Sequence, residues 1–332
     1  MKRGWIHWDR TELPPAAFAA RLGRLRQSLA ERGLPAVALY SDIWCSNHGR
    51  YFVNFMPYWN RSLVVVPKEG KPLLLCGLSP RVYPWIRSVT VLEEIRPAGN
   101  PARQLLELAA EKQWKRLGLL GRARWPQEIA GPLSQGAVDL EDVPPAGVYQ
   151  PGSDEWEIAM RRRAAGMART ILADEMSHGS EEEDYQFVGR LERAFRRAGA
   201  EEVGILLSDG RSVPAPPRGK TFRDGCSVTV AMEYRGHWVR LSRPHTTPPV
   251  EESLRHRWEV QLRHVQEPSH LACYAETLSG SLPYESCDRF ELRPGDLFAF
   301  HVQFRTNGQR LFYGDSCWFG ETEAEPLCAE PL

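Results

Sequence analysis

The chain has 332 residues, of which 42% are hydrophobic and 25% are charged, the balance of a globular protein with room for two domains. Lys and Arg number 42, as do Asp and Glu. This zero net charge argues against nucleic acid or a membrane surface as partner, because both are bound through excess basic charge. The start of the chain lacks the apolar core of a signal peptide, and the seven cysteines are scattered without a CxxC pair. We therefore expect a cytoplasmic protein with reduced thiols.

The first half of the sequence alternates between helical and strand patterns. Prolines followed by apolar residues at helical spacing begin the first predicted helix, and Gly33 ends it. The turn signal Lys68-Glu69-Gly70-Lys71 joins two apolar runs into a hairpin. Helices are predicted over 14–32, 101–113 and 126–133, and strands over 36–40, 62–67, 72–76, 116–121 and 138–140. The alternation predicts an α/β domain over residues 1–148.

The second half changes to a pattern rich in strands. Pro144, Pro145 and Pro151 prevent a helix at the boundary, so a second domain is expected over residues 149–332. Helices are predicted over 156–176, 183–199 and 250–266, and strands over 202–208, 227–235, 237–243, 297–305 and 309–320. The consecutive strands favour an antiparallel sheet with helices packed on one face, which is an α+β layout.

Several segments resemble the creatinase/prolidase family in consistent order along nearly the whole chain. In the first half, NHGRYFVNF (47–55) and NRSLVVVPKEGKPLLL (60–75) resemble a tyrosine-containing strand and the hairpin of the creatinase N-terminal domain. In the second half, RDGCSVTVAMEYRGHWVRLSRP (223–244), LRPGDLFAFHVQF (292–304) and YGDSCWFGETEAEPL (313–327) resemble strands of the catalytic domain. The resemblance implies a creatinase-type α/β N-terminal domain and an α+β pita-bread domain with a curved antiparallel sheet. The family holds peptidases, amidinohydrolases and non-catalytic members, so the fold alone names no reaction.

The sequence departs from this family at the residues that would hold its metals. Metallopeptidases of the family bind two metal ions with two aspartates, one histidine and two glutamates. The second aspartate falls here at Arg240, and the two glutamates fall at His301 and Gly314. The first aspartate should fall among residues 230–232, which contain no aspartate. The histidine should fall among residues 277–282, which contain no histidine. We therefore expect no metal and no cofactor, because divalent ions need several oxygen or imidazole ligands together.

The same resemblance suggests what the altered site contains. Arg240 brings a permanent cation into the place of a metal, which favours a carboxylate or another anionic group of a small-molecule substrate. The metal-free mechanism of creatinase is not carried over by residue either, because Pro214-Ala215 stand where its catalytic histidine would fall. The candidate catalytic residues are His301, Glu233 and Glu285, and the candidate substrate-binding residues are Arg240, Arg243, Tyr284, Trp59, Arg61 and Asp315.

The resemblance also implies a homodimer. Related enzymes complete their pocket with N-domain residues of a partner subunit, and Trp59 and Arg61 would do so here. Three functions remain open on the sequence. They are a metal-independent hydrolase or lyase acting on a C–N bond of a small anionic or zwitterionic molecule, a catalytically silent protein that binds a metabolite, peptide or partner protein, and an Xaa-Pro-type metallopeptidase. A pocket that gathers Arg240, His301 and a carboxylate would favour the first, and a filled pocket would favour the second.

Overall fold

A computed structural model describes residues 6–145, 148–149, 154–177, 182–247, 249–265, 273–277, 292–306 and 308–328. The chain folds into two compact units, residues 1–150 and 151–332. The boundary that we expected from the sequence, after residue 148, belongs to the same proline-containing segment. Within the described ranges, no helix has the length and apolar character needed to cross a membrane.

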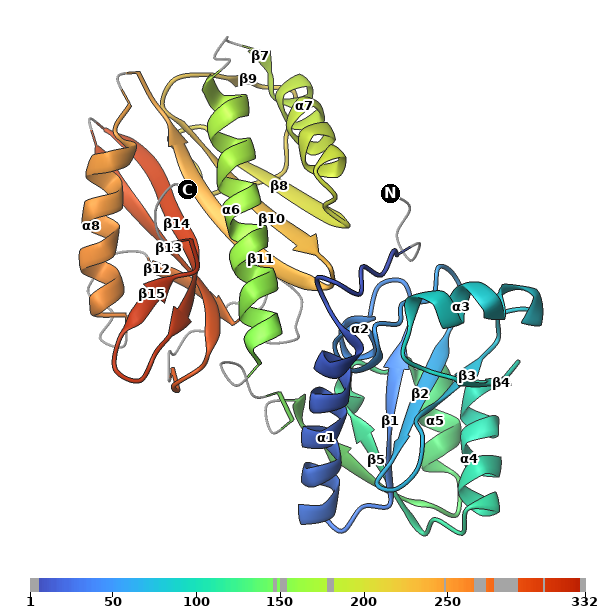
Figure 1. Cartoon of the computed structure of the whole chain (residues 1–332). Coiled ribbons are helices and arrows are strands. Elements are labelled where there is room, and N and C mark those ends of the chain that lie inside the picture. The colour runs from blue at the N-terminus through green and yellow to red at the C-terminus, as the bar shows by residue number, and fades with distance from the viewer. Residues whose placement is uncertain are drawn as a thin grey trace. The chain divides into compact units, whose positions relative to one another are not determined.

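A six-stranded mixed sheet lies at the centre of the first unit (Figure 1). The strand order is β4-β3-β2-β1-β5-β6, with antiparallel pairing from β1 through β2 to β3 and parallel pairing elsewhere. The strands are β1 (Ala36–Ser41), β2 (Ser62–Pro67), β3 (Leu73–Cys76), β4 (Glu94–Pro97), β5 (Arg116–Leu120) and β6 (Asp139–Val143). The predicted hairpin is therefore present as β2 and β3.

Helices cover both faces of this sheet and bury its apolar side chains. The helices are α1 (Pro15–Glu31), α2 (Asn47–Val53), α3 (Tyr83–Val89), α4 (Pro101–Glu111) and α5 (Gln127–Ser134), with short 3-10 turns over Pro80–Val82 and Arg122–Arg124. Leu25 of α1 and Val37 of β1 belong to the core on one face, whereas Leu105 of α4 and Ala38 of β1 belong to the core on the other. Successive strand residues thus feed two separate cores, which gives a three-layer α/β unit.

One expectation in this unit was wrong. Residues 47–53, which we compared with a tyrosine-containing strand, form helix α2. Asn54 ends this helix in the left-handed conformation, at φ 55°, which asparagine tolerates better than most residues. Its side chain accepts a hydrogen bond from Arg50 and donates one to the carbonyl of Val89, so the helix end is held by its own cap.

The second unit is built on an antiparallel sheet of seven strands. The order is β12-β13-β14-β11-β10-β8, and β15 pairs with β14. The strands are β8 (Glu202–Ser208), β10 (Cys226–Tyr234), β11 (His237–His245), β12 (Cys273–Thr277), β13 (Leu297–Thr306), β14 (Gln309–Phe319) and β15 (Ala324–Pro326), and a separate small sheet pairs β7 (Glu182–Glu183) with β9 (Thr221–Phe222). The long strands agree with the pattern expected from the sequence.

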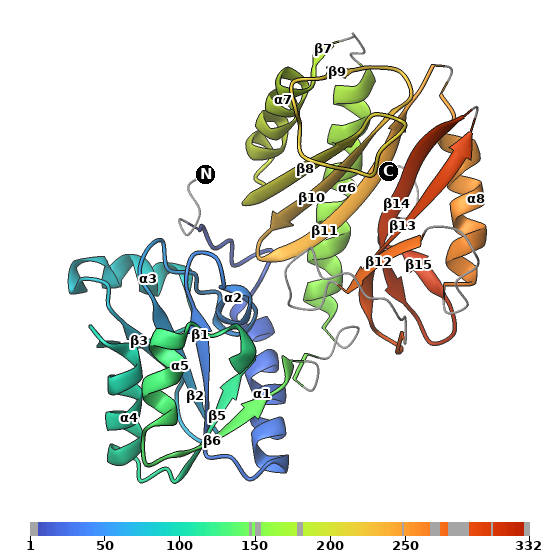
Figure 2. The same ribbon diagram turned by 180° about the vertical axis from the view of Figure 1, so that it is seen from behind.

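The described helices of this unit lie on one face of the large sheet (Figures 1 and 2). They are α6 (Glu155–Ser177), α7 (Asp184–Arg197) and α8 (Glu251–Arg263). Helix α8 packs on β13 and β14, where Trp258 lies among Phe298, Phe300 and Val302. Helix α6 packs on β10 and β11, and its Arg163 stacks over the ring of Tyr234. Figure 2 shows the opposite face, on which no described helix lies.

Candidate functional site

Four neighbouring strands place one residue each in a row across the helix-free face. Thr229 of β10 lies opposite Ser242 of β11, Ser242 lies opposite Gly314 of β14, and Gly314 lies opposite His301 of β13. Residues that are directly opposite in antiparallel strands share a face. Because Phe300 and Val302 pack under α8, His301 between them points to the other face. The row is thus formed by Thr229, Ser242, Gly314 and His301, and we call it the hydroxyl–imidazole row.

A short hairpin turn sets the register of this row. Strands β10 and β11 are joined by Arg235 and Gly236, and both have positive φ, at 51° and 79°. Two residues of this conformation make the tight turn whose twist matches that of antiparallel strands. Residues equally distant from the turn are then paired, which brings Thr229 opposite Ser242.

The side chains of the row are joined by hydrogen bonds. The Ser242 hydroxyl lies 2.7 Å from the Thr229 hydroxyl and 2.8 Å from Nδ1 of His301. Thr229 is 2% exposed, Ser242 is 1% exposed and His301 is 4% exposed. Such burial makes each hydrogen bond consequential, because a buried polar atom that loses its partner also lacks water to replace it.

Gly314 makes room for the imidazole. A Cβ atom at this position would overlap Nδ1 and Cγ of His301 as well as the carbonyl oxygen of Phe300. The ring of His301 therefore crosses the β14 backbone in the space that a side chain at residue 314 would need, and this is how Nδ1 reaches Ser242 on the next strand.

His301 is held in its neutral form. Burial lowers the pKa of its imidazole well below the ordinary value, and the positive charges of Arg240 and Arg243 lower the pKa further. Nδ1 is occupied by Ser242, whereas Nε2 has no hydrogen-bond partner among the residues that the structure describes. A neutral histidine with one uncommitted ring nitrogen is able to accept or donate a proton.

Arg240 lies on the same face as Ser242, two residues earlier along β11. The backbone here is tied to β14 through a side chain. The Ser316 hydroxyl accepts a hydrogen bond from the Arg240 N–H at 2.7 Å and donates one to the Arg240 carbonyl at 3.1 Å. This bridge fixes the part of β11 that carries the guanidinium beside the row.

Arg243 and Asp315 are brought together, but on the helix-covered face. Arg243 donates to the Asp315 carboxylate at 2.8 Å and to the Gly314 carbonyl at 2.7 Å. Its guanidinium stacks over the Tyr313 ring and lies 2.9 Å from the carboxylate of Glu251, in the first turn of α8. Burial raises the pKa of the Asp315 carboxyl, and Arg243 opposes that shift. This pair does not line the face that carries His301.

The other predicted site residues are not gathered around the row. Glu233 is buried on the same face as Thr229, but four residues further along β10, which is about 13 Å on a strand. Tyr284 and Glu285 lie outside the described residues. Trp59 and Arg61 belong to the first unit, where Trp59 is 58% exposed and Arg61 pairs with Glu128.

Sequence reasoning missed the hydroxyl groups of the site. Thr229, Ser242 and Ser316 were not singled out, because a lone serine or threonine in a strand carries no motif. The signal that would have found the first two is symmetry about the Arg235-Gly236 turn, since pairing the hairpin around that turn sets Thr229 against Ser242.

The residues of this face do not fit the pair of metal ions that the family resemblance implies. Arg240 supplies a cation where a ligand is needed, and Gly314 supplies no donor atom. In the described part of the chain, no three His, Cys, Asp or Glu side chains are grouped as metal ligands. The chemistry of the row is therefore that of hydroxyl, imidazole and guanidinium groups.

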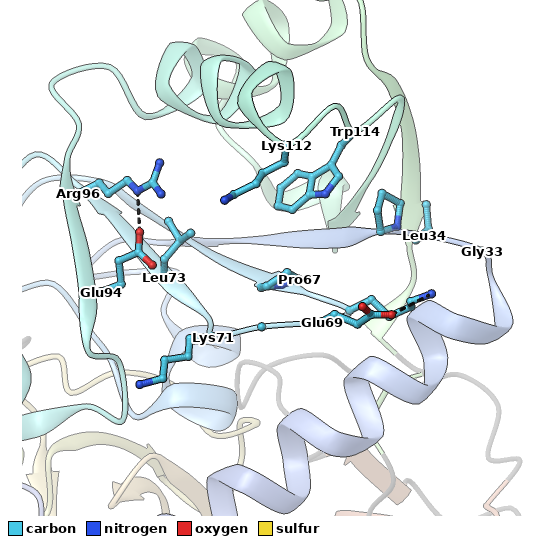
Figure 3. A pocket seen from close by; sticks show the side chains of 13 residues that line it. Gly33, Leu34, Pro67, Glu69, Lys71, Leu73, Glu94, Arg96, Lys112 and Trp114 are labelled. Carbon is cyan, nitrogen blue, oxygen red and sulfur yellow. Dashed lines mark hydrogen bonds and ion pairs between the residues drawn. The ribbon is translucent and has the colours of Figure 1, made fainter.

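A hollow lies in the first unit, at the end of the sheet where β2 turns into β3 (Figure 3). Its volume is about 530 Å³, and Trp114 and Lys112 line one wall. The basic residues at its rim pair with exposed glutamates, as in Arg96–Glu94 at 2.7 Å, Lys71–Glu93 at 2.5 Å and Lys112–Glu111 at 3.3 Å. Exposed pairs of this kind are screened by solvent and bind weakly. The hydroxyl–imidazole row is therefore the stronger candidate.

Comparison with known proteins supports the fold. No family profile and no curated protein matches the sequence. Among solved structures, the chain is similar to a prolidase from Pyrococcus horikoshii (TM-score 0.72, 10% identity, 94% of this chain and 99% of that chain). It is also similar to an X-Pro aminopeptidase from Thermotoga maritima (TM-score 0.72, 15% identity, 93% and 98%) and an Xaa-Pro dipeptidase from Bacillus anthracis (TM-score 0.68, 16% identity, 95% and 98%). The predicted fold, a creatinase-type α/β domain followed by a pita-bread domain, is confirmed.

Proposed function

We propose that the protein is a metal-independent hydrolase that acts on a C–N bond of a small anionic or zwitterionic molecule at the hydroxyl–imidazole row. The observation that carries the proposal is a neutral His301, bound through Nδ1 to Ser242 and lying within the field of Arg240. The similar structures are peptidases, and this supports amide chemistry without naming a substrate for this chain.

In this proposal Arg240 binds the carboxylate of the substrate and His301 moves the proton. A guanidinium offers parallel N–H groups that match the two oxygens of a carboxylate. Nε2 of His301 takes a proton from water as the water oxygen bonds to the carbonyl carbon. The same proton passes to the leaving nitrogen when the C–N bond breaks, so the products are an acid and an amine.

The remaining candidates have lesser parts in the proposal. Glu285 would be a second proton carrier and Tyr284 a substrate contact, from the segment outside the described residues. Glu233 lies two residues beyond Ala231, which is paired with Arg240, so any part of Glu233 would be played beside Arg240 and not beside His301. Arg243 and Asp315 support the sheet from the opposite face rather than binding the substrate.

We also propose a cytoplasmic homodimer in which Trp59 and Arg61 complete the pocket of the partner subunit. The large exposed ring of Trp59 supports this idea, because exposed aromatic residues are enriched where proteins associate. Light scattering would give the oligomeric state, and the variant Trp59→Ala should weaken substrate binding without unfolding the protein. A monomer in solution would remove this part of the proposal.

A catalytically silent binding protein is the second candidate, and the burial of the row favours it. Ser242 is 1% exposed and His301 is 4% exposed, so the row is nearly closed to solvent. A closed row would hold a ligand, or simply complete the core, without turnover. Hydrolysis of bound ligand separates the two functions.

The test is a thermal-shift screen of short peptides, N-acyl amino acids and guanidino acids, with and without a chelator, followed by detection of released amine for each hit. A ligand of the folded state raises the melting temperature by mass action. We expect hits that carry a carboxylate and that survive chelation. The variant Arg240→Met should abolish the shift, whereas Arg305→Met, which changes an exposed arginine on β13, should retain it. Stoichiometric manganese, cobalt or zinc in the purified protein would overturn metal independence.

A further inference from the structure

The Ser242 hydroxyl lies between two partners, and the direction of its hydrogen bonds decides what His301 can do. Neutral imidazole carries one ring proton, so one nitrogen donates and the other accepts. In one arrangement Thr229 donates to Ser242, Ser242 donates to Nδ1, and the proton of the ring is on Nε2. In the other arrangement Nδ1–H donates to Ser242, and Ser242 donates to Thr229. The two arrangements present opposite chemistry at Nε2.

The first arrangement is opposed by the surroundings of Nε2. It would place a buried N–H where no acceptor lies among the described residues. A buried donor without an acceptor is among the costlier defects of a folded protein.

The second arrangement makes the unpartnered buried atom an acceptor instead of a donor, which is the less costly of the two. The Nδ1 proton has Ser242 as its acceptor at 2.8 Å, and the Ser242 proton has Thr229 at 2.7 Å. Because the hydrogen bond to Ser242 keeps the ring proton on Nδ1, Nε2 of the neutral ring carries no proton.

We propose that Thr229 and Ser242 are positioning residues that hold His301 as the Nδ1–H tautomer and leave Nε2 as a proton acceptor. The value of this tautomer for catalysis rests on the proposed hydrolase function, since a general base needs a bare nitrogen. The tautomer itself is a property of the free protein. It is measured without a substrate, so a failure of the hydrolase proposal leaves the measurement intact.

Nitrogen NMR of protein labelled at histidine tests the proposal. We expect a pyrrole-type signal for Nδ1 of His301 and a pyridine-type signal for Nε2 at pH 7. The chain has nine histidines, and the signals that vanish in His301→Gln identify the ring. A pyrrole-type Nε2 in the unmodified protein overturns the proposal, and the variant His301→Gln serves only to assign the signals.

Two matched substitutions of Thr229 then separate the effect of its hydrogen bond from the effect of its volume. Thr229→Val removes the hydroxyl at nearly constant shape, and Thr229→Ser retains the hydroxyl with a smaller side chain. We expect Thr229→Val and Ser242→Ala to change the ratio of the two tautomers by about fivefold or more, which corresponds to the loss of about one hydrogen bond. Thr229→Ser should keep the ratio of the unmodified protein. Equal spectra for Thr229→Val, Ser242→Ala and the unmodified protein would show that the hydroxyls only fill space, and would overturn the proposal.

Discussion

In the C-terminal sheet, residues that are adjacent in sequence point to opposite faces and have different surroundings. Arg243 and Asp315 follow directly after Ser242 and Gly314 in the sequence, yet they point to the helix-covered face. There the guanidinium has carboxylate partners in Asp315 and Glu251 and the Tyr313 ring beneath it. The buried positive charge of Arg243 is therefore paired with carboxylates of the protein itself.

The helix-free face carries neutral polar groups in its row. Ser242 and His301 are bound to each other, but Nε2 of His301 has no partner among the described residues. Charge alone therefore does not distinguish a site from a support, because both faces carry an arginine. Each face also keeps a buried polar atom without a hydrogen-bond partner in the described structure, Nε2 of His301 on one and Oδ1 of Asp315 on the other. What distinguishes them is the group that carries this atom: a neutral imidazole in the row, and a carboxylate paired with Arg243 on the helix-covered face.

Replacing each arginine by methionine is the most severe test of this comparison. Arg243→Met leaves Asp315 buried without its cation, and breaking a buried pair in this way costs about 3–5 kcal/mol of unfolding free energy. Arg240→Met should cost clearly less, because Arg240 is only half-buried. Urea denaturation measures both.

Arg305→Met is the control for this pair, since Arg305 is exposed, and we expect its unfolding free energy to change by no more than about 0.5 kcal/mol. Equal losses for Arg243→Met and Arg240→Met would mean that both faces are supports, and the contrast between them would fail.

The pH dependence of stability tests whether His301, on the helix-free face, is neutral in the folded protein. The folded protein keeps His301 neutral below its ordinary pKa of 6.5, while the unfolded chain takes up a proton there. The unfolded state is therefore favoured as pH falls, and the stability present above pH 6.5 declines by about 1.4 kcal/mol for each pH unit below it.

In the variant His301→Gln there is no imidazole at this position, so the unfolded chain takes up no proton there. The unmodified protein should therefore lose about 2 kcal/mol more unfolding free energy than the variant between pH 6.5 and pH 5. His48 also has a lowered pKa, of about 4, and it contributes equally to both proteins. Denaturant titrations at a series of pH values measure the difference. Parallel curves would show that the pKa of His301 is the same in the folded and unfolded states, contrary to the effect of its burial.

Much of the fold could be predicted from the sequence, because apolar periodicity and turn residues act locally. The hairpin around Gly70 and the long strands of the second half were found in this way. Helix α2 was not found, since its residues are almost all buried and the helical period is hidden. Its end depends on the left-handed Asn54 and on a long-range bond to Val89, which no local pattern contains.

The site was predictable in part. Arg240 and His301 were identified by their place in the resemblance, and the structure brings both to the helix-free face. Arg243 and Asp315 were assigned to the same pocket by their place in the same resemblance. Strand alternation sends them to the other side. Thr229 and Ser242 could not be recognised, because their role depends on the pairing of strands and on Gly314 giving space to the imidazole.

The smallest expected effect concerns the hydroxyl that ties β11 to β14. Ser316→Ala removes two hydrogen bonds to the backbone of Arg240 and should cost about 1–2 kcal/mol of unfolding free energy. Ser227→Ala is a matched control, because its buried hydroxyl accepts a hydrogen bond from the Phe312 N–H at 3.0 Å. Stability should fall in both variants. Only Ser316→Ala should shift the His301 nitrogen signals, since only Ser316 holds the backbone that carries the Arg240 charge. If both variants left those signals unchanged, the hydrogen bonds of Ser316 would not determine where the charge of Arg240 lies relative to His301.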